Sequence, residues 1–144
     1  QTLAAVATSS ALPLLAQTAK PQVVVWKDAS CGCCKDWIAH MQSNGFSVKA
    51  HDSGNTAARA RLGLPQKLGS CHTALVGGYV VEGHVPASDV KRLLKERPKA
   101  LGLAVPGMPV GSPGMDGPEY GGRKDRYEVL LVQADGSTRT FSRY

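Results

Sequence analysis

Three of the four cysteines of this chain stand within four positions, in the sequence CGCC at residues 31–34, and the fourth is Cys71, followed by His72. Structural disulfides usually join cysteines that are distant along the chain, whereas the neighbours Cys33 and Cys34 cannot pair without backbone strain. The clustering therefore indicates chemistry at the thiols rather than a stabilising framework.

The cysteine motif is expected at the start of a helix that runs from Cys31 to about Ser43. Unpaired backbone N–H groups and the helix dipole stabilise a thiolate at this position, which lowers its pKa. Cys31 and Cys34 lie one turn apart and are the candidate catalytic redox pair. Cys33 adds a third thiol, which dithiol exchange does not need, and Cu(I) prefers thiolate and thioether ligands. The motif therefore predicts a soft-metal site, copper before zinc.

Cys71 and His72 are expected at the entrance to the third strand, where a thioredoxin-type fold normally carries a cis-proline beside its active cysteines. Four thiols and one imidazole can then converge on one spot. Four thiolates exceed the usual coordination number of a single Cu(I), so we hypothesise bridging sulfurs and more than one copper ion. His72 ranks first among the histidine ligands, His51 and His84 are weaker candidates, and His40 is assigned to the helix surface or its boundary.

A segment rich in glycine and proline, residues 99–126, supplies a second kind of soft ligand. Met108 and Met115 each stand in a Pro/Gly frame, and a thioether is a suitable ligand for Cu(I). The alternative is that these methionines pack the loop onto the core. Beside a four-thiol cluster, we add both to the candidate metal ligands.

Other interpretations of the cysteines stay open. The chain can be a plain disulfide oxidoreductase, or the cysteines can form two structural disulfides. Zinc in a closed four-cysteine site is less favoured, because three ligands within four residues do not match the paired C-x₂-C spacing of zinc knuckles.

The elements that must position these residues follow from the hydrophobic pattern. The expected order is strand, helix, strand, helix, strand, strand, helix, with Gly77-Gly78 as a hairpin turn between the last two strands. The expected ranges are 22–26, 31–43, 46–51, a short helix from about 55 to 62, 71–76, 79–82 and a helix that follows Pro86. With the cysteines between the first strand and the first helix, this is the thioredoxin order.

The fold class is therefore α/β, with a thioredoxin-like core at residues 21–98 and a Gly/Pro-rich C-terminal extension at 99–144 that ends in a β-hairpin. No regular structure is expected in 99–126, whereas 127–133 and 138–144 should pair across an Asp-Gly turn. The extension should pack on the core and the metal site within a single domain, as a length of 144 residues suggests.

Residues 1–20 read as the remnant of a secretory signal peptide or a disordered segment, because residues 1–19 are small, apolar and uncharged. An ordered N-terminal helix is the alternative. Export would place the protein in a bacterial periplasm.

The net charge is +6, but the basic residues are scattered apart from a group at 91–99 that fits a solvated helix face. We expect a monomer with no nucleic-acid partner and no membrane span in the mature protein.

Three blocks of the sequence resemble the CopG-like proteins of bacterial copper-resistance systems, a family formerly classed as a domain of unknown function. The blocks are WKDASCGCCK at 26–35; SCHTA at 70–74 with GY at 78–79 and EGHVP at 82–86; and GLAVPGMP at 102–109 with GSPGM at 111–115. The resemblance spans roughly residues 22–133. It implies a periplasmic thioredoxin-like protein that binds copper at its CxCC motif and takes part in copper redox handling during detoxification.

Three functions remain under consideration. The first is an oxidoreductase that interconverts Cu(I) and Cu(II), with the thiolates as ligands and electron relay. The second is a carrier that hands Cu(I) to a periplasmic copper efflux system without redox turnover. The third is a metal-free thiol-disulfide oxidoreductase.

Overall fold

The computed structural model describes Pro13 and residues 19–144, so most of the segment interpreted as a signal peptide lies outside the described residues. The described elements are β1 Gln22–Lys27, α1 Gly32–Ser43, β2 Ser47–His51, α2 Asn55–Arg61, η1 Gln66–Leu68, β3 His72–Val76, β4 Tyr79–Glu82, α3 Ala87–Glu96, β5 Gly102–Ala104, η2 Pro118–Tyr120, β6 Glu128–Val132 and β7 Thr138–Arg143. The mixed α/β architecture predicted from the sequence is confirmed.

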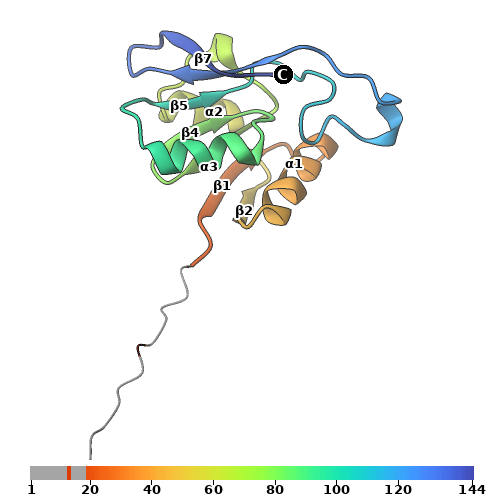
Figure 1. The fold of residues 1–144 in the computed structure, drawn as a ribbon, viewed down its shortest axis with the longest axis horizontal. Coiled ribbons are helices and arrows are strands. Elements are labelled where there is room, and N and C mark those ends of the chain that lie inside the picture. The colour runs from red at the N-terminus through yellow and green to blue at the C-terminus, as the bar shows by residue number, and fades with distance from the viewer. Residues whose placement is uncertain (1–12, 14–18) are drawn as a thin grey trace, which may run out of the picture.

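All seven described strands form one sheet in the order β2-β1-β3-β4-β5-β6-β7 (Figure 1). The pairs β1–β2 and β4–β5 are parallel, and the other neighbours are antiparallel. The predicted hairpin at Gly77-Gly78 is confirmed, since Val76 pairs directly with Tyr79 across the turn. Both glycines adopt positive φ, as a two-residue hairpin turn requires.

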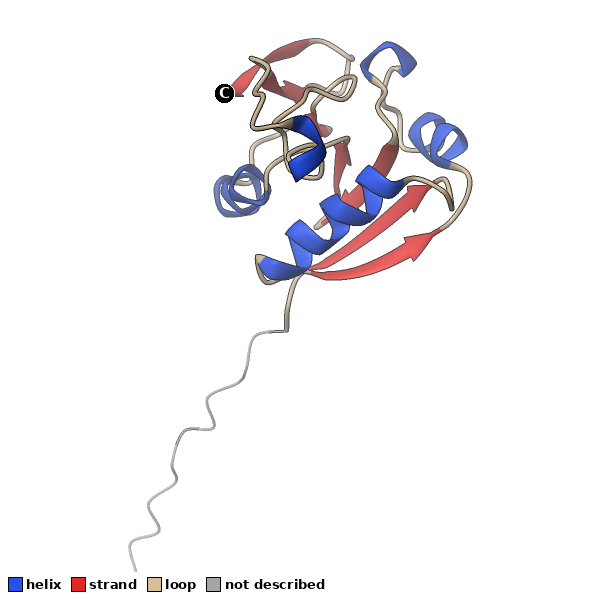
Figure 2. Ribbon diagram, turned by 90° about the vertical axis from the view of Figure 1, so that its right-hand side faces the viewer, coloured by secondary structure: helices blue, strands red, loops and turns tan. Residues whose placement is uncertain are grey.

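The two faces of the sheet are covered by different helices (Figure 2). On one face α1 and α3 bury a cluster that includes Trp37, Met41 and Leu93 against the strands. On the other face, the segment through α2 and η1 places Leu64 and Leu68 in a smaller cluster. Side chains alternate along each strand, so the sheet contributes to both clusters.

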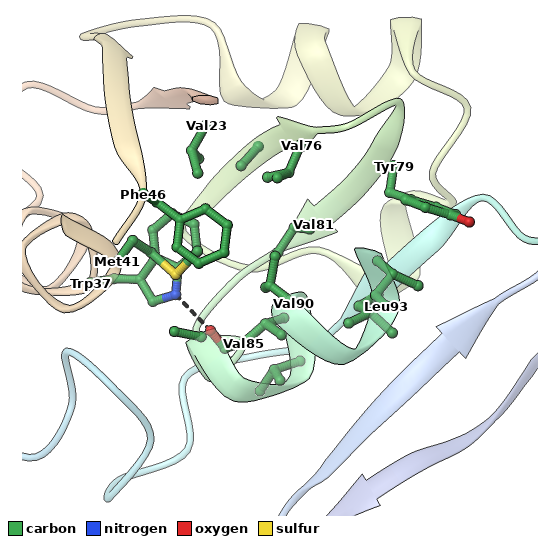
Figure 3. Packing of buried hydrophobic residues seen from close by; sticks show 14 of the residues in the cluster. Val23, Trp37, Met41, Phe46, Val76, Tyr79, Val81, Val85, Val90 and Leu93 are labelled. Atoms are coloured by element: carbon green, nitrogen blue, oxygen red, sulfur yellow. Dashed lines mark hydrogen bonds between the residues drawn. The ribbon is translucent and has the colours of Figure 1, made fainter. Parts of the chain in front are cut away.

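Trp37 ties α1 to the strand-to-helix connection that precedes α3. Its indole Nε1 donates a 2.9 Å hydrogen bond to the carbonyl of Val85 (Figure 3). The Trp37 ring is fully buried among Met41, Phe46 and Val85. This packing fixes the first turns of α1, and with them the cysteine motif, relative to the end of β4.

The expectation of no regular structure in residues 99–126 is wrong, because β5 lies inside this stretch. Gly102–Ala104 pairs with β4 on one side and β6 on the other. A Cβ atom at Gly102 would stand 1.8 Å from the carbonyl oxygen of Val80, so glycine allows the close approach of the two strands. Tertiary pairing therefore overrides the weak local preference of a glycine-rich sequence. The rest of the stretch is loop with the short η2, and the predicted terminal hairpin forms as β6 and β7.

Candidate metal centre

The cysteine motif lies at the C-terminal end of β1, where the chain turns into α1. Cys31 is the N-cap residue of α1, and Cys33 and Cys34 belong to its first turn. β3 runs antiparallel to β1 with His72 opposite Lys27, so the residue before His72 arrives at the same end of the sheet. This register brings Cys71 to the cysteine motif from 37 positions away.

The four sulfur atoms form a thiol cluster, a name used below for Cys31, Cys33, Cys34 and Cys71. All four ligand atoms lie within 4.8 Å of one another. Cys31 and Cys34 are joined by a disulfide, whereas Cys33 and Cys71 are free. The Cys33 Sγ lies 3.6 Å from the Cys31 Sγ and 3.8 Å from the Cys71 Sγ. Cys34 is fully buried and the other three are partly exposed.

Two imidazoles approach the Cys71 sulfur from the protein interior. His84 Nε2 lies 3.0 Å from the Cys71 Sγ and His72 Nδ1 lies 3.4 Å from it. From the sequence we expect His72 as the first histidine ligand and His84 as a weaker candidate. In the structure, however, the ring nitrogen of His84 lies closer to the Cys71 sulfur than that of His72. The register of the β3–β4 hairpin could have predicted this contact. Because Val76 pairs with Tyr79, continuing the same register beyond the strands sets Cys71 opposite His84.

Both imidazoles are neutral near pH 7. Burial, followed by the neighbouring His84, lowers the pKa of His72 to about 3. Burial also lowers the pKa of His84, although the carbonyl of Pro113 partly offsets this effect. A neutral imidazole offers a lone pair to a metal ion. Burial, followed by the charge of Cys33, raises the pKa of the Cys71 thiol to about 12, so only a nearby cation would make this sulfur a thiolate at neutral pH.

The glycine-rich loop after β5 packs directly on the centre. A Cβ atom at Gly114 would lie 2.7 Å from the Cys33 carbonyl oxygen and 3.0 Å from His84 Nδ1. The adjacent Pro113 accepts a 2.7 Å hydrogen bond from His84 Nδ1 through its carbonyl. The loop therefore covers one side of the centre and orients one imidazole.

The two candidate methionines differ in their surroundings. Met115 is almost buried, and its sulfur accepts a hydrogen bond from the Tyr120 hydroxyl at 3.3 Å. Met108 is 51% exposed and follows Gly107, whose carbonyl accepts a hydrogen bond from the Ser70 hydroxyl beside Cys71. Both methionines thus sit one residue from a glycine that contacts the edge of the centre. Their role as ligands stays a prediction.

The remaining histidines have other partners. His51 stacks on Trp26 with ring centroids 5.5 Å apart, at the β2 edge of the sheet. His40 accepts a hydrogen bond from the backbone N–H of Ala87 through Nε2, which links α1 to the start of α3.

One family model and two solved structures are similar to this chain. A family model described as "Protein of unknown function, DUF411" matches residues 68–115. Two solved structures, titled copper resistance protein copG form 1 and form 2, are each 47% identical to this chain. Each match covers 87% of this chain and 98% of the solved chain, with a TM-score of 0.80. The chain belongs to the CopG family.

Membership of the CopG family confirms the resemblance drawn from the CxCC motif and its companion blocks. No curated protein matches the chain. The DUF411 match begins just before Cys71 and ends at Met115, so it spans both imidazoles and the covering loop. Among the described residues, no helix has the length and apolar character needed to cross a membrane.

Proposed function

We propose that this chain binds copper in the periplasm as part of bacterial copper resistance and interconverts Cu(I) and Cu(II) at the thiol cluster. The observation that supports this most strongly is the convergence of four cysteine ligand atoms within 4.8 Å in a member of the CopG family. Thiolates are the protein ligands that Cu(I) prefers. Two free thiols beside a dithiol/disulfide pair supply both a binding site and a source of electrons.

The redox step balances on the Cys31–Cys34 pair. Each of the two reduced thiols gives one electron to a Cu(II) ion, two protons are released, and the S–S bond of the disulfide form closes. Two Cu(I) ions result, to be held by the remaining soft ligands. A dithiol reductant in the same compartment returns the pair to its reduced state by thiol-disulfide exchange.

The position of Cys33 supports a multinuclear site. Its sulfur lies 3.6 Å from that of Cys31 and 3.8 Å from that of Cys71. A sulfur this close to two other cysteines can bridge two copper ions, one of which Cys31 also binds and the other Cys71. We therefore propose Cys31, Cys33, Cys34 and Cys71 as ligands together with His72, and Met108 and Met115 as thioether ligands from the loop.

A second candidate is metal-free thiol-disulfide exchange, which the Cys31–Cys34 disulfide at the start of α1 favours. A third is a Cu(I) carrier for a periplasmic efflux system, which the partial exposure of Cys31, Cys33 and Cys71 favours. Copper consumes thiols only in the first function, and copper is bound without loss of thiols only in the carrier.

An anaerobic Cu(II) titration of the fully reduced chain separates them. Copper reduction predicts one Cu(I), measured with a Cu(I)-specific chelator, for every thiol lost, and this loss should be abolished in Cys31→Ser. A carrier would bind added Cu(I) but leave Cu(II) unreduced. A metal-free exchanger would reduce a model disulfide at the same rate in wild type and in Cys33→Ser.

We assign the periplasmic location from the uncharged, small-residue segment at 1–19. Cell fractionation combined with N-terminal sequencing of the exported chain tests it, and a cytoplasmic chain that retains this segment would contradict it.

We also propose that residues 21–98 form the thioredoxin-like core and 99–144 an extension within one domain. The continuous seven-stranded sheet supports the single domain.

A further inference from the structure

A short segment outside the helices and strands brings Cys71 to the metal centre. η1 ends at Leu68 and β3 begins at His72, so Gly69 and Ser70 belong to neither element. The peptide groups of such a segment lack the regular partners of a helix or a ladder and must find others. The partners of Ser70 therefore decide where the following residue, Cys71, lies.

Both backbone groups of Ser70 bind a buried ion pair between Arg59 of α2 and Glu82 at the end of β4. The Ser70 N–H donates to Glu82 Oε1 at 2.8 Å, and Arg59 Nη2 donates to the Ser70 carbonyl at 2.9 Å. Glu82 is fully buried and Arg59 is 6% exposed, with Nη2 and Oε1 2.8 Å apart. The ion pair therefore holds the peptide groups on both sides of the Ser70 Cα, including the one that leads into Cys71.

The other polar atoms of the ion pair are fixed by their own neighbours. Glu82 Oε2 accepts a 2.6 Å hydrogen bond from the Thr73 hydroxyl. Arg59 Nη1 donates to Gln66 Oε1 at 2.7 Å, and its Nε donates to Glu82 Oε1 at 2.8 Å. A Cβ atom at Gly69 would lie 2.8 Å from the Arg59 Cζ, so the guanidinium packs directly against this glycine. Neither charged side chain can rotate without breaking several of these bonds.

Glu82 connects the two sides of the contact between Cys71 and His84. Its carboxylate holds Ser70, the residue before Cys71, while its backbone pairs with Thr73 and leads within two residues to His84. His84 Nε2 lies 3.0 Å from the Cys71 Sγ. A shift of the Ser70 peptide would therefore move the sulfur relative to the imidazole.

Stability alone explains this ion pair poorly. Taking two charges out of water carries a large desolvation cost, and apolar residues of similar volume often replace such a pair without loss of stability. An apolar side chain cannot do what the guanidinium fork of Arg59 does here, which is to donate at once to a carboxylate, a side-chain amide oxygen and a backbone carbonyl.

We propose that Arg59 and Glu82 are positioning residues, which hold the Ser70–Cys71 peptide and thereby fix the Cys71 sulfur in the metal centre. They act through Ser70 rather than as ligands. Their importance for copper chemistry rests on the proposed function, whereas the positioning of Cys71 is a property of the metal-free chain and is tested there.

The test measures the reactivity of Cys71 without metal. In Cys33→Ser with the Cys31–Cys34 disulfide intact, Cys71 is the one free thiol of the full chain. Its rate of alkylation at constant pH reports its surroundings, because a thiol held among buried groups reacts slowly and a released thiol reacts faster. Arg59→Met in this parent should raise the rate by at least ~10-fold.

Two further variants separate positioning from a loss of stability, and they carry the test if Arg59→Met does not fold. Arg59→Lys keeps a charge opposite Glu82 but lacks the fork that reaches Ser70 and Gln66. Arg59→Met/Glu82→Leu leaves no unpaired charge buried. Both should unfold at higher urea concentration than Arg59→Met, yet both should keep the fast alkylation of Cys71.

Arg92→Met is the matched control, because Arg92 joins α3 to β7 through a 3.0 Å hydrogen bond to the Phe141 carbonyl and should not affect the Cys71 rate. An unchanged rate in the Arg59 variants would overturn the positioning role. A rate that returns to the parent value as stability returns would overturn it too. Failure of wild type to reduce Cu(II) would instead refute the proposed function alone, since the alkylation assay needs no metal.

Discussion

Replacing Gly114 by alanine should loosen the metal centre from outside it. Gly114 has a φ of +90°, where an L-residue costs about 1–2 kcal/mol. The new Cβ would lie 2.7 Å from the Cys33 carbonyl oxygen, 2.9 Å from the Trp37 nitrogen and 3.0 Å from His84 Nδ1. Two of these atoms belong to the backbone of α1 and cannot rotate away, so crowding should add about 1–3 kcal/mol.

The loop must move outward to relieve this crowding, and the hydrogen bond from His84 to the Pro113 carbonyl is lost with it. We expect Gly114→Ala to lower the free energy of unfolding by roughly 2–5 kcal/mol. Loss of the outer partner of His84 should weaken metal binding by roughly 10–100-fold. Urea unfolding and competition with a copper chelator measure the two effects.

Gly121→Ala is the matched control, because Gly121 also has positive φ, at +61°, but no atom stands within 4 Å of its Cβ position. It should show the backbone effect of about 1–2 kcal/mol and no change in copper affinity. Equal stability losses in the two variants, or an unchanged copper affinity in Gly114→Ala, would refute the contact between loop and centre.

Three further outcomes are expected from the fold. Arg59→Met breaks the buried ion pair with Glu82 (2.8 Å) and should destabilise the protein by about 3–5 kcal/mol. Burial raises the pKa of Glu82, so the stability linked to protonation of this carboxyl is fully present at low pH and falls as the pH rises through that pKa. Without Arg59, whose charge lowers the pKa, Glu82 can take up a proton at low pH instead of remaining an unpaired buried charge. The loss of unfolding free energy in Arg59→Met should therefore be smaller at about pH 5 than at about pH 8, and equal losses would contradict this. Burial, then Tyr144 and Asp89, raises the pKa of Tyr127 to about 12; stability in urea should therefore fall as the pH rises from about 10 toward 12, less steeply in Tyr127→Phe, and parallel curves would count against it. Gly102→Ala should lower the unfolding free energy by at least ~3 kcal/mol, and a change below ~1 kcal/mol would show that β5 tolerates a side chain there.

Much of the fold could be predicted because local pattern and tertiary role agree. The β-branched run QVVVW is a buried strand, and Gly77-Gly78 sets a two-residue hairpin. The strand β5 could not be predicted in the same way, because its three residues lie in a glycine-rich segment with no alternating pattern. They form a strand because they pair with β4 on one side and β6 on the other.

The residues of the metal centre also differ in how well the sequence predicts their positions. The spacing within residues 31–34 places three thiols on one helical turn, and the strand order brings Cys71 to them. The sequence underrates His84 because its partner lies across a hairpin, and only the register of that hairpin, counted outward from the turn, sets it opposite Cys71. The contact between Gly114 and α1 depends on the path of a long loop, for which the sequence carries no periodic signal.

Copper X-ray absorption spectroscopy of the anaerobically loaded chain tests the central claim most directly. Four converged thiols in the reduced Cu(I) form predict a first shell dominated by sulfur, with copper–copper scattering from ions bridged at Cys33. The sulfur contribution should fall in Cys31→Ser and Cys33→Ser. A first shell of nitrogen and oxygen alone, unchanged by these substitutions, would contradict copper binding at the thiol cluster.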